Sequence, residues 1–214
     1  NKEFRKSFAF RMKTDSETKL TRHTGFHERT SKLTRNFVDA RGFWLPNDYT
    51  KHGIINEHNA CREKAVVIDL SSLRKFEILG PDAEELMNYT LTRNVKKLSV
   101  GQVVYSSMCY ENGTMFDDGT LLKLSDHGFR WVCGDEYAGQ WLKEQATKKN
   151  YKVLIKNSTD QINNISLQGP NSRKILEKII FTPPTQPSIS ELQWFRFTIC
   201  RLEELNGIPL IVSR

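Results

Sequence analysis

The feature that most constrains the fold is the segment from Tyr105 to Leu124, which the sequence predicts to be a β-hairpin. Apolar and β-branched residues flank Asn112-Gly113, and Asn-Gly is a strong signal for a tight hairpin turn because both residues tolerate positive φ. The second strand then carries two adjacent carboxylates, Asp117 and Asp118, before Gly119 and a return to leucine.

The two aspartates do not fit an ordinary strand. Aspartate is depleted in strands, and a charge beside a core-facing row costs free energy unless it is paired or solvated. Adjacent strand residues point to opposite faces, so at least one carboxylate faces a core or a cavity. One interpretation is a strand bent or bulged at Gly119 with a capping aspartate. The other is a carboxylate directed into a ligand pocket, and the pattern leaves both open.

Composition places the chain among globular proteins. With 214 residues, 38% hydrophobic and 27% charged, it is long enough for one large or two small domains. No apolar run approaches the roughly 18 residues of a membrane span, so no membrane partner is expected. The four cysteines lie far apart without a C-x-x-C pair, and no signal peptide precedes them, which favours reduced thiols and a cytoplasmic location.

The formal net charge is +7, and much of the excess lies before Arg41. We interpret residues 1–22 as a basic N-terminal arm, which could meet nucleic acid or an anionic surface. No aromatic-interleaved basic motif, zinc-finger spacing or helix-turn-helix signal accompanies it, so no nucleic-acid partner is expected. A positive surface also suits a polyanionic cofactor or an acidic carrier protein.

A metal site is conceivable on the helix predicted at residues 54–64. Ile54, His58 and Cys61 recur there at i, i+4 and i+7, on one stripe. One histidine and one cysteine fall short of the usual three or four ligands. We therefore expect no metal and a packed or hydrogen-bonded His58.

An internal echo links two distant segments. Phe76-x-Ile78-x-Gly80-Pro81 and Ile165-x-Leu167-x-Gly169-Pro170 match position by position, and each is followed by an apolar pair. Each copy predicts a strand, a Gly-Pro corner and a helix, because proline suits the first turn of a helix. The echo favours two subdomains built in the same way.

Further elements are expected along the chain. These are a short helix within 24–38, an aromatic loop or edge at 41–46, a buried strand at 66–68, strands at 129–133, 151–155, 162–167 and 194–199, a helix at 136–148 with Tyr137, Trp141 and the stem of Lys143 toward the core, and a hairpin turn at 205–208.

Together, several short segments resemble a known family. They are Gly42-Phe43-Trp44-Leu45-Pro46 with Tyr49, Ile54-Ile55-Asn56-Glu57-His58, Ile68-Asp69-Leu70-Ser71, Gly80-Pro81-Asp82-Ala83, Val100-Gly101-Gln102, Gly113 through Asp118, and Leu167-Gln168-Gly169-Pro170. In this order and spacing the chain resembles, from Thr24 to Arg214, the folate-binding part of the glycine-cleavage T-protein (aminomethyltransferase) family.

The resemblance implies an α+β fold of two ferredoxin-like, βαβ-type subdomains with folate between them. Residues 63–145 would form an inserted subdomain that carries the hairpin, and residues 23–62 plus 146–214 a split subdomain. The family's C-terminal barrel domain is not in the sequence, which stops within a predicted strand, so we expect a C-terminally truncated fragment.

The resemblance also implies a tetrahydrofolate-dependent transferase that moves a methylene or methyl group to N5 of tetrahydrofolate. Relatives keep the second acidic position of the hairpin more often, so the catalytic role falls on Asp118. Tyr105, Asp117, Leu73 and Arg214 are the expected cofactor-binding residues, and no metal is implied. A small-molecule one-carbon donor or a lipoyl carrier protein would be the partner.

Two departures from the family pattern widen the choice of reaction. Ser72 stands where the T-protein usually has histidine, and residues 134–137 replace its usual asparagines. The alternatives are therefore a tetrahydrofolate-dependent S-, O- or N-demethylase and a non-catalytic folate-binding module.

Overall fold

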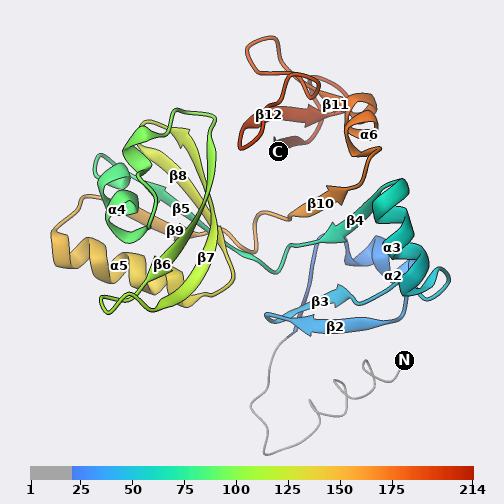
Figure 1. Ribbon diagram of the computed structural model, residues 1–214, viewed down its shortest axis with the longest axis horizontal. Coiled ribbons are helices and arrows are strands. Elements are labelled where there is room, and N and C mark those ends of the chain that lie inside the picture. Colours follow the sequence, from blue (N-terminus) through green and yellow to red (C-terminus); the bar gives the residue numbers. More distant parts are fainter. Residues whose placement is uncertain (1–20) are drawn as a thin grey trace, which may run out of the picture. The chain divides into compact units, whose positions relative to one another are not determined.

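The computed structural model describes residues 21–214, so the predicted basic arm lies almost wholly outside the described residues. The fold is α+β, and its contacts divide the chain into two units (Figure 1). The first unit holds residues 21–72 and Gln161–Ser172, and the second holds Leu73–Asp160 and Arg173–Arg214. These boundaries differ from the predicted ones, because residues 146–160 and 173–214 group with the hairpin and residues 63–72 do not.

The first unit contains two small sheets. One has the strand order β1-β3-β2, and the other pairs β4 with β10 in antiparallel fashion. The elements are β1 Arg22–His23, α2 His27–Leu33, β2 Phe37–Ala40, β3 Phe43–Pro46, α3 Gly53–Glu63, β4 Val66–Asp69 and β10 Ile165–Gln168. The expected loop or edge at 41–46 is thus mostly the central strand of its sheet, because Arg41 and Gly42 both take positive φ, 54° and 79°, and close a two-residue hairpin turn.

Two predictions about burial in this unit are wrong. Helix α3 forms as expected but buries no residue, and His58 is exposed rather than packed. Strand β4 is not buried either, since Val67 and Ile68 are 52% and 46% exposed. A sheet of only two strands is too narrow to bury such side chains.

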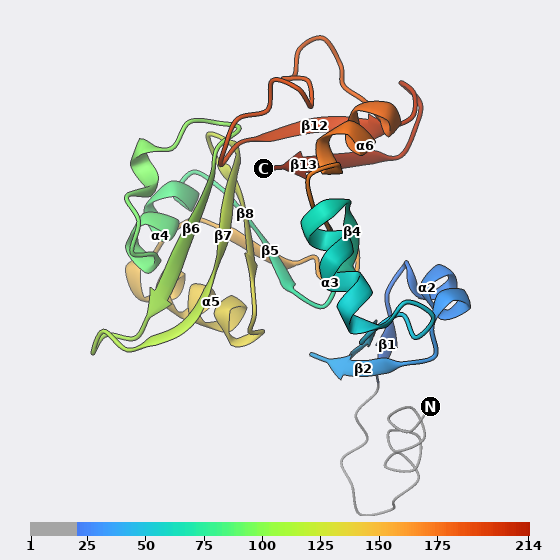
Figure 2. The same cartoon turned by 45° about the vertical axis from the view of Figure 1, so that its right-hand side comes forward.

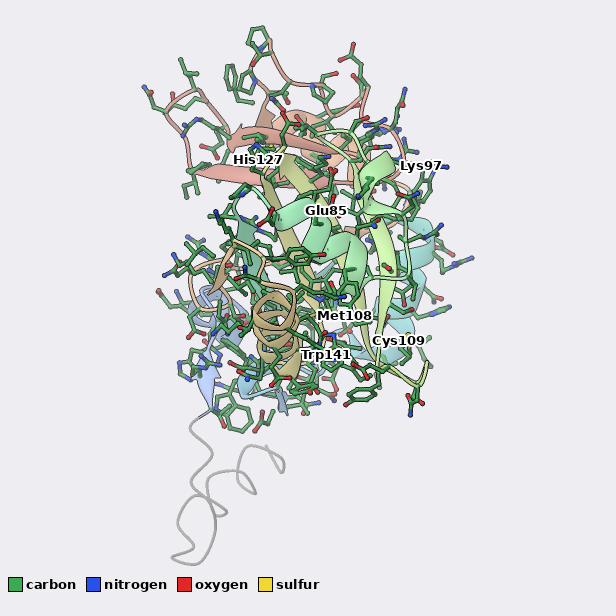
Figure 3. The ribbon with its side chains drawn as sticks, turned by 90° about the vertical axis from the view of Figure 1, so that its left-hand side faces the viewer. Glu85, Lys97, Met108, Cys109, His127 and Trp141 are labelled. Atoms are coloured by element: carbon green, nitrogen blue, oxygen red, sulfur yellow. The ribbon has the colours of Figure 1, made fainter. Side chains whose placement is uncertain are left out.

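The second unit is built on a five-stranded sheet of order β6-β7-β8-β5-β9, and α4 and α5 cover one face (Figures 1 and 3). The elements are β5 Arg74–Leu79, α4 Ala83–Thr90, η1 Val95–Lys97, β6 Val103–Cys109, β7 Met115–Ser125, β8 Gly128–Cys133, α5 Tyr137–Lys149 and β9 Leu154–Asn157. The core lies between helices and sheet, and Leu86 and Met87 of α4 are fully buried in it, as predicted.

Helix α5 turns only part of the predicted face to the core. Ala138, Leu142 and Ala146 are buried, whereas Tyr137 is 38% exposed and Lys143 is exposed. The cause is close packing at Gly139, where an added Cβ would lie only 2.3 Å from the ring of Phe76. Trp141 packs against the core, as predicted, and together with Tyr137 it also joins Tyr110 and Phe116 in an aromatic cluster at the hairpin tip.

The last sheet has the order β11-β12-β13, and α6 lies beside it (Figure 2). Its elements are α6 Ser172–Ile179, β11 Ile180–Phe181, β12 Phe197–Leu202 and β13 Pro209–Ser213. Strand β12 starts later than predicted because Phe195 takes a left-handed φ of 52°. The Phe195 carbonyl accepts a hydrogen bond from the Val103 amide at 2.9 Å, which joins this segment to the base of the hairpin.

The internal repeat includes more elements in the structure than the sequence pattern indicates. A run of helix, strand, strand, Gly-Pro corner and helix occurs twice, as α3-β4-β5-α4 and as α5-β9-β10-α6. The two copies exchange strands, because β4 pairs with β10 and β5 pairs with β9. Each copy therefore contributes one strand to each unit.

The hydrogen bonds repeat as well. The Lys75 amide donates to Thr159 Oγ1 at 3.1 Å, and the Asn164 amide donates to Ser71 Oγ at 3.0 Å. The Gly-Pro corners agree in the same way: a Cβ added at Gly80 would meet the Lys152 carbonyl at 2.4 Å, and one at Gly169 would meet the Lys64 carbonyl at 2.6 Å. Only glycine fits where one backbone approaches another this closely.

Candidate functional site

The hairpin β6–β7 forms with one extra residue in its second strand. Asp118 lies opposite Ser107 and Asp117 opposite Met108, but Met115 lies opposite Cys109, so Phe116 is a bulge. The bulge is therefore not at Gly119, where the capping interpretation placed it. Bulges of this kind redirect the side chains that follow them, which here are the two aspartates.

The turn also differs from the simplest expectation. Of the Asn-Gly pair, only Gly113 has positive φ, 83°, and its amide donates to the Tyr110 carbonyl at 2.9 Å. The loop is thus a four-residue turn ending in glycine rather than a turn in which both residues are left-handed.

Asp117 points to the core side, with 7% of its surface exposed. Its carboxylate accepts hydrogen bonds from the amides of Asp118 at 2.9 Å, Gly134 at 3.2 Å and Asp135 at 3.1 Å. Three backbone donors satisfy a buried carboxylate and tie β7 to the loop between β8 and α5. The capping interpretation thus describes Asp117, whose oxygens already have partners.

Asp118 points to the opposite face, as the strand alternation predicts, and is half-buried. The hydroxyl of Tyr105, on the neighbouring strand, donates a hydrogen bond to Asp118 Oδ2, and this bond raises the pKa of Tyr105. Arg93 Nε in turn donates to the Tyr105 carbonyl at 3.2 Å. Asp118 and Tyr105, two of the predicted site residues, are therefore brought together.

Cys133 of β8 and Gly119 of β7 are paired across the sheet, next to the two aspartates. Cys133 is 2% exposed, and burial, followed by the charge of Asp117, raises the pKa of its thiol. A Cβ on Gly119 would lie 2.2 Å from the Val132 carbonyl oxygen, so β7 and β8 approach here as only glycine permits. This close approach fixes the strand that carries Asp118.

The other two predicted residues lie apart from this pair. Leu73 is half-buried in the turn that precedes β5. The Arg214 guanidinium lies 5.2 Å from the centre of the Trp194 ring, and its Nη1 donates to the Leu192 carbonyl at 3.0 Å. Within residues 21–214 neither has a hydrogen bond, ion pair or ring contact with Asp118.

Three features of the site were missed from the sequence. The amides of Gly134 and Asp135 bind the Asp117 carboxylate, and Arg93 supports Tyr105. Backbone donors leave no residue signature, because their direction depends on the turn after β8. A polar residue in the linker before the hairpin, such as Arg93, was a weak signal.

The described part of the chain holds no group of three or more His, Cys, Asp or Glu side chains placed to bind a metal, and no helix long and apolar enough to cross a membrane. Two cavities of about 470 Å³ lie elsewhere in the second unit, one between α5 and β9 and one beside β12. Neither is lined by Asp118 or Tyr105.

Comparison with known proteins gives the class. Residues 26–214 match the family described as the GCVT N-terminal domain, and the chain therefore belongs to that family. A glycine cleavage system aminomethyltransferase T from Bartonella henselae has the same fold, with a TM-score of 0.69 at 24% identity, covering 84% of this chain and 50% of that one. The predicted family and fold class are confirmed.

Two of the relatives are named for different reactions. A trimethylamine-oxide aldolase of Ruegeria pomeroyi is 50% identical over 99% of this chain and 27% of its own length. An aminomethyltransferase of Alkaliphilus metalliredigens is 30% identical over 94% of this chain and 51% of its own length. The chain thus spans about half of the aminomethyltransferases it matches and about a quarter of the aldolase.

Proposed function

We propose that this protein is a cytoplasmic, tetrahydrofolate-dependent one-carbon transferase in which Asp118 is the catalytic residue. The observation that carries the proposal is the Asp118 carboxylate, held by Tyr105 on the face of the hairpin that turns away from the core. Family membership supports the reaction class, because several relatives are aminomethyltransferases.

The chemistry suits the residue. Tetrahydrofolate would supply the N5 amine that accepts the one-carbon unit and becomes positively charged as the new bond forms. The Asp118 carboxylate would stabilise that charge or remove a proton from the nitrogen, a contribution of about 10²–10⁴ in rate. Its Oδ1 has no hydrogen-bond partner among the described residues, so one oxygen is free for this contact.

The remaining cofactor contacts are proposed from position and from the family resemblance. Tyr105 lies beside Asp118 and would line the same surface, whereas the parts assigned to Leu73 and Arg214 rest on the family resemblance. The Asp117 carboxylate is already occupied by three amides. We therefore assign it no direct contact with folate.

The donor is a second question, and one observation favours an N-methyl substrate. The relative with 50% identity is named a trimethylamine-oxide aldolase. Trimethylamine oxide has the atoms of dimethylamine plus formaldehyde, so such cleavage releases a one-carbon unit that an amine acceptor can capture. A small-molecule donor thus gains support over a lipoyl carrier protein, while S- or O-demethylation and a non-catalytic folate-binding module remain alternatives.

The test is anaerobic calorimetry of tetrahydrofolate binding, followed by turnover with formaldehyde as the donor. We expect micromolar binding by the parent, and an Asp118→Asn variant that binds folate but transfers carbon at least 100-fold more slowly than the parent, in line with the loss of a general acid–base group of about 10²–10⁴. A folded parent without detectable binding would refute the folate proposal. Binding with equal turnover in parent and variant would remove Asp118 from the chemistry.

A further inference from the structure

We propose that Asp117 and Tyr105 are positioning residues that together fix the direction of the Asp118 carboxylate, Asp117 through the backbone and Tyr105 through the side chain. The inference rests on the proposed function only for its catalytic consequence. The geometric part can be tested without folate.

Asp117 fixes the backbone. One of the three amides bound by its carboxylate belongs to Asp118 itself, at 2.9 Å, and the other two belong to Gly134 and Asp135. The peptide of Asp118 is thereby tied to a loop beyond β8, the next strand of the sheet. Asp117 forms no ion pair within residues 21–214, so these amides are what compensates its buried charge.

The bulge at Phe116 makes this arrangement possible. Without an extra residue, alternation would place Phe116 on the same face as Asp118. With it, Phe116 packs against Trp141 and Tyr110, whose ring centroids lie 5.4 Å and 4.8 Å from its own, while Asp117 faces the core opposite the fully buried Met108. The strand is anchored immediately before the two aspartates.

Tyr105 fixes the side chain. It lies opposite Thr120, and Asp118 lies opposite Ser107, so the two residues are diagonal neighbours on one face of the hairpin. The Tyr105 hydroxyl donates its hydrogen bond to Oδ2 of Asp118, and Oδ1 has no hydrogen-bond partner among the described residues. A carboxylate held at one oxygen is directed without being blocked.

The experiment is a measurement of the χ1 rotamer populations of Asp118 from three-bond NMR couplings in the free protein. The parent should show one dominant rotamer, and Tyr105→Phe should show averaging over several, because an exposed phenylalanine preserves the strand but donates no hydrogen bond. Asp117→Asn should shift the amide signals of Asp118, Gly134 and Asp135 and also average the rotamers.

Ser158→Ala is the matched control. It removes a buried hydroxyl that donates to Glu77 at 2.9 Å elsewhere in the second unit, so it should lower stability and leave the Asp118 rotamer unchanged. Should Asp117→Asn fail to fold, Tyr105→Phe alone decides the geometric claim, since Tyr105 is 47% exposed.

Kinetics supply the second readout. A misdirected carboxylate should lower kcat about 10–100-fold in each positioning variant while the Kd for tetrahydrofolate changes less than about twofold. A single Asp118 rotamer retained in both variants would overturn the inference. A parent that binds no folate, but whose Asp118 rotamer depends on Tyr105 and Asp117, would overturn the proposed function and leave the positioning intact.

Discussion

Replacing Gly119 by alanine tests whether the close approach of β7 and β8 holds the candidate site together. Two effects oppose each other here. Glycine in an ordinary strand is less stable than alanine by about 0.5–1 kcal/mol, so the substitution would stabilise a strand with open space around it. Gly119 has no open space, because an added Cβ would lie 2.2 Å from the Val132 carbonyl oxygen.

The destabilisation caused by the clash should exceed the stabilisation gained by replacing a strand glycine. A contact of 2.2 Å is more than about 1 Å short of ordinary van der Waals separation, and the atom it meets is backbone rather than a flexible side chain. The new Cβ would also lie 3.0 Å from Cys133 Cβ and from Trp131 Cζ2, which belong to the core. Overpacking costs about 1–3 kcal/mol, and each ladder hydrogen bond lost adds about 1 kcal/mol, so we expect a loss of about 3 kcal/mol.

Urea unfolding followed by far-ultraviolet circular dichroism measures this loss. Gly113→Ala is the control, because Gly113 has φ of 83° but no atom within 4 Å of the added Cβ, so it carries backbone strain of about 1 kcal/mol without a clash. A Gly119→Ala protein as stable as the parent, or more stable, would contradict the packing seen between β7 and β8.

Two further predictions concern buried charge and pH. Glu84→Gln should destabilise the second unit by about 2–3 kcal/mol in urea, because it leaves Lys123, 6% exposed, without the carboxylate that lies 2.5 Å from its Nζ. Because the pKa of the Cys133 thiol is raised in the folded protein, the unfolded chain loses this proton first as pH rises. The free energy of unfolding should therefore fall above about pH 9, with Cys133 contributing up to about 1.4 kcal/mol per pH unit, and Cys133→Ala should reduce this slope; an unchanged slope would rule the thiol out as a source.

Much of the local structure was predictable because local signals and tertiary structure agree. The hairpin at Asn112-Gly113, the helix after Gly80-Pro81 and the opposite faces of the two aspartates follow from turn chemistry and strand alternation. Burial was less predictable. The stripe through His58 has helical spacing, yet α3 buries nothing, since periodicity does not say whether another layer covers a face.

The site was predictable only in its residue types. Two adjacent aspartates in a strand indicate a role other than packing, but the sequence does not say which of the two carboxylates is buried. That depends on the bulge at Phe116 and on the amides of Gly134 and Asp135, and neither has a sequence signature of its own. The division of the contacts into two units was not predictable for a related reason, because strand exchange between the two copies is a long-range pairing.

The duplication supplies an internal reference for the candidate site. Each Gly-Pro helix is followed by a hairpin with an Asn-Gly turn, at Gly113 in the first copy and at Gly207 in the second. With the bulge at Phe116 allowed for, the strand register places Asp117, opposite Met108, where the second hairpin has Leu210, opposite Cys200. Asp118 likewise corresponds to Ile211. The apolar pair is what a strand of this architecture needs for packing. The aspartates therefore depart from the structural requirement of the repeat, and this departure, independent of any relative, supports the proposal that the first hairpin carries the chemistry.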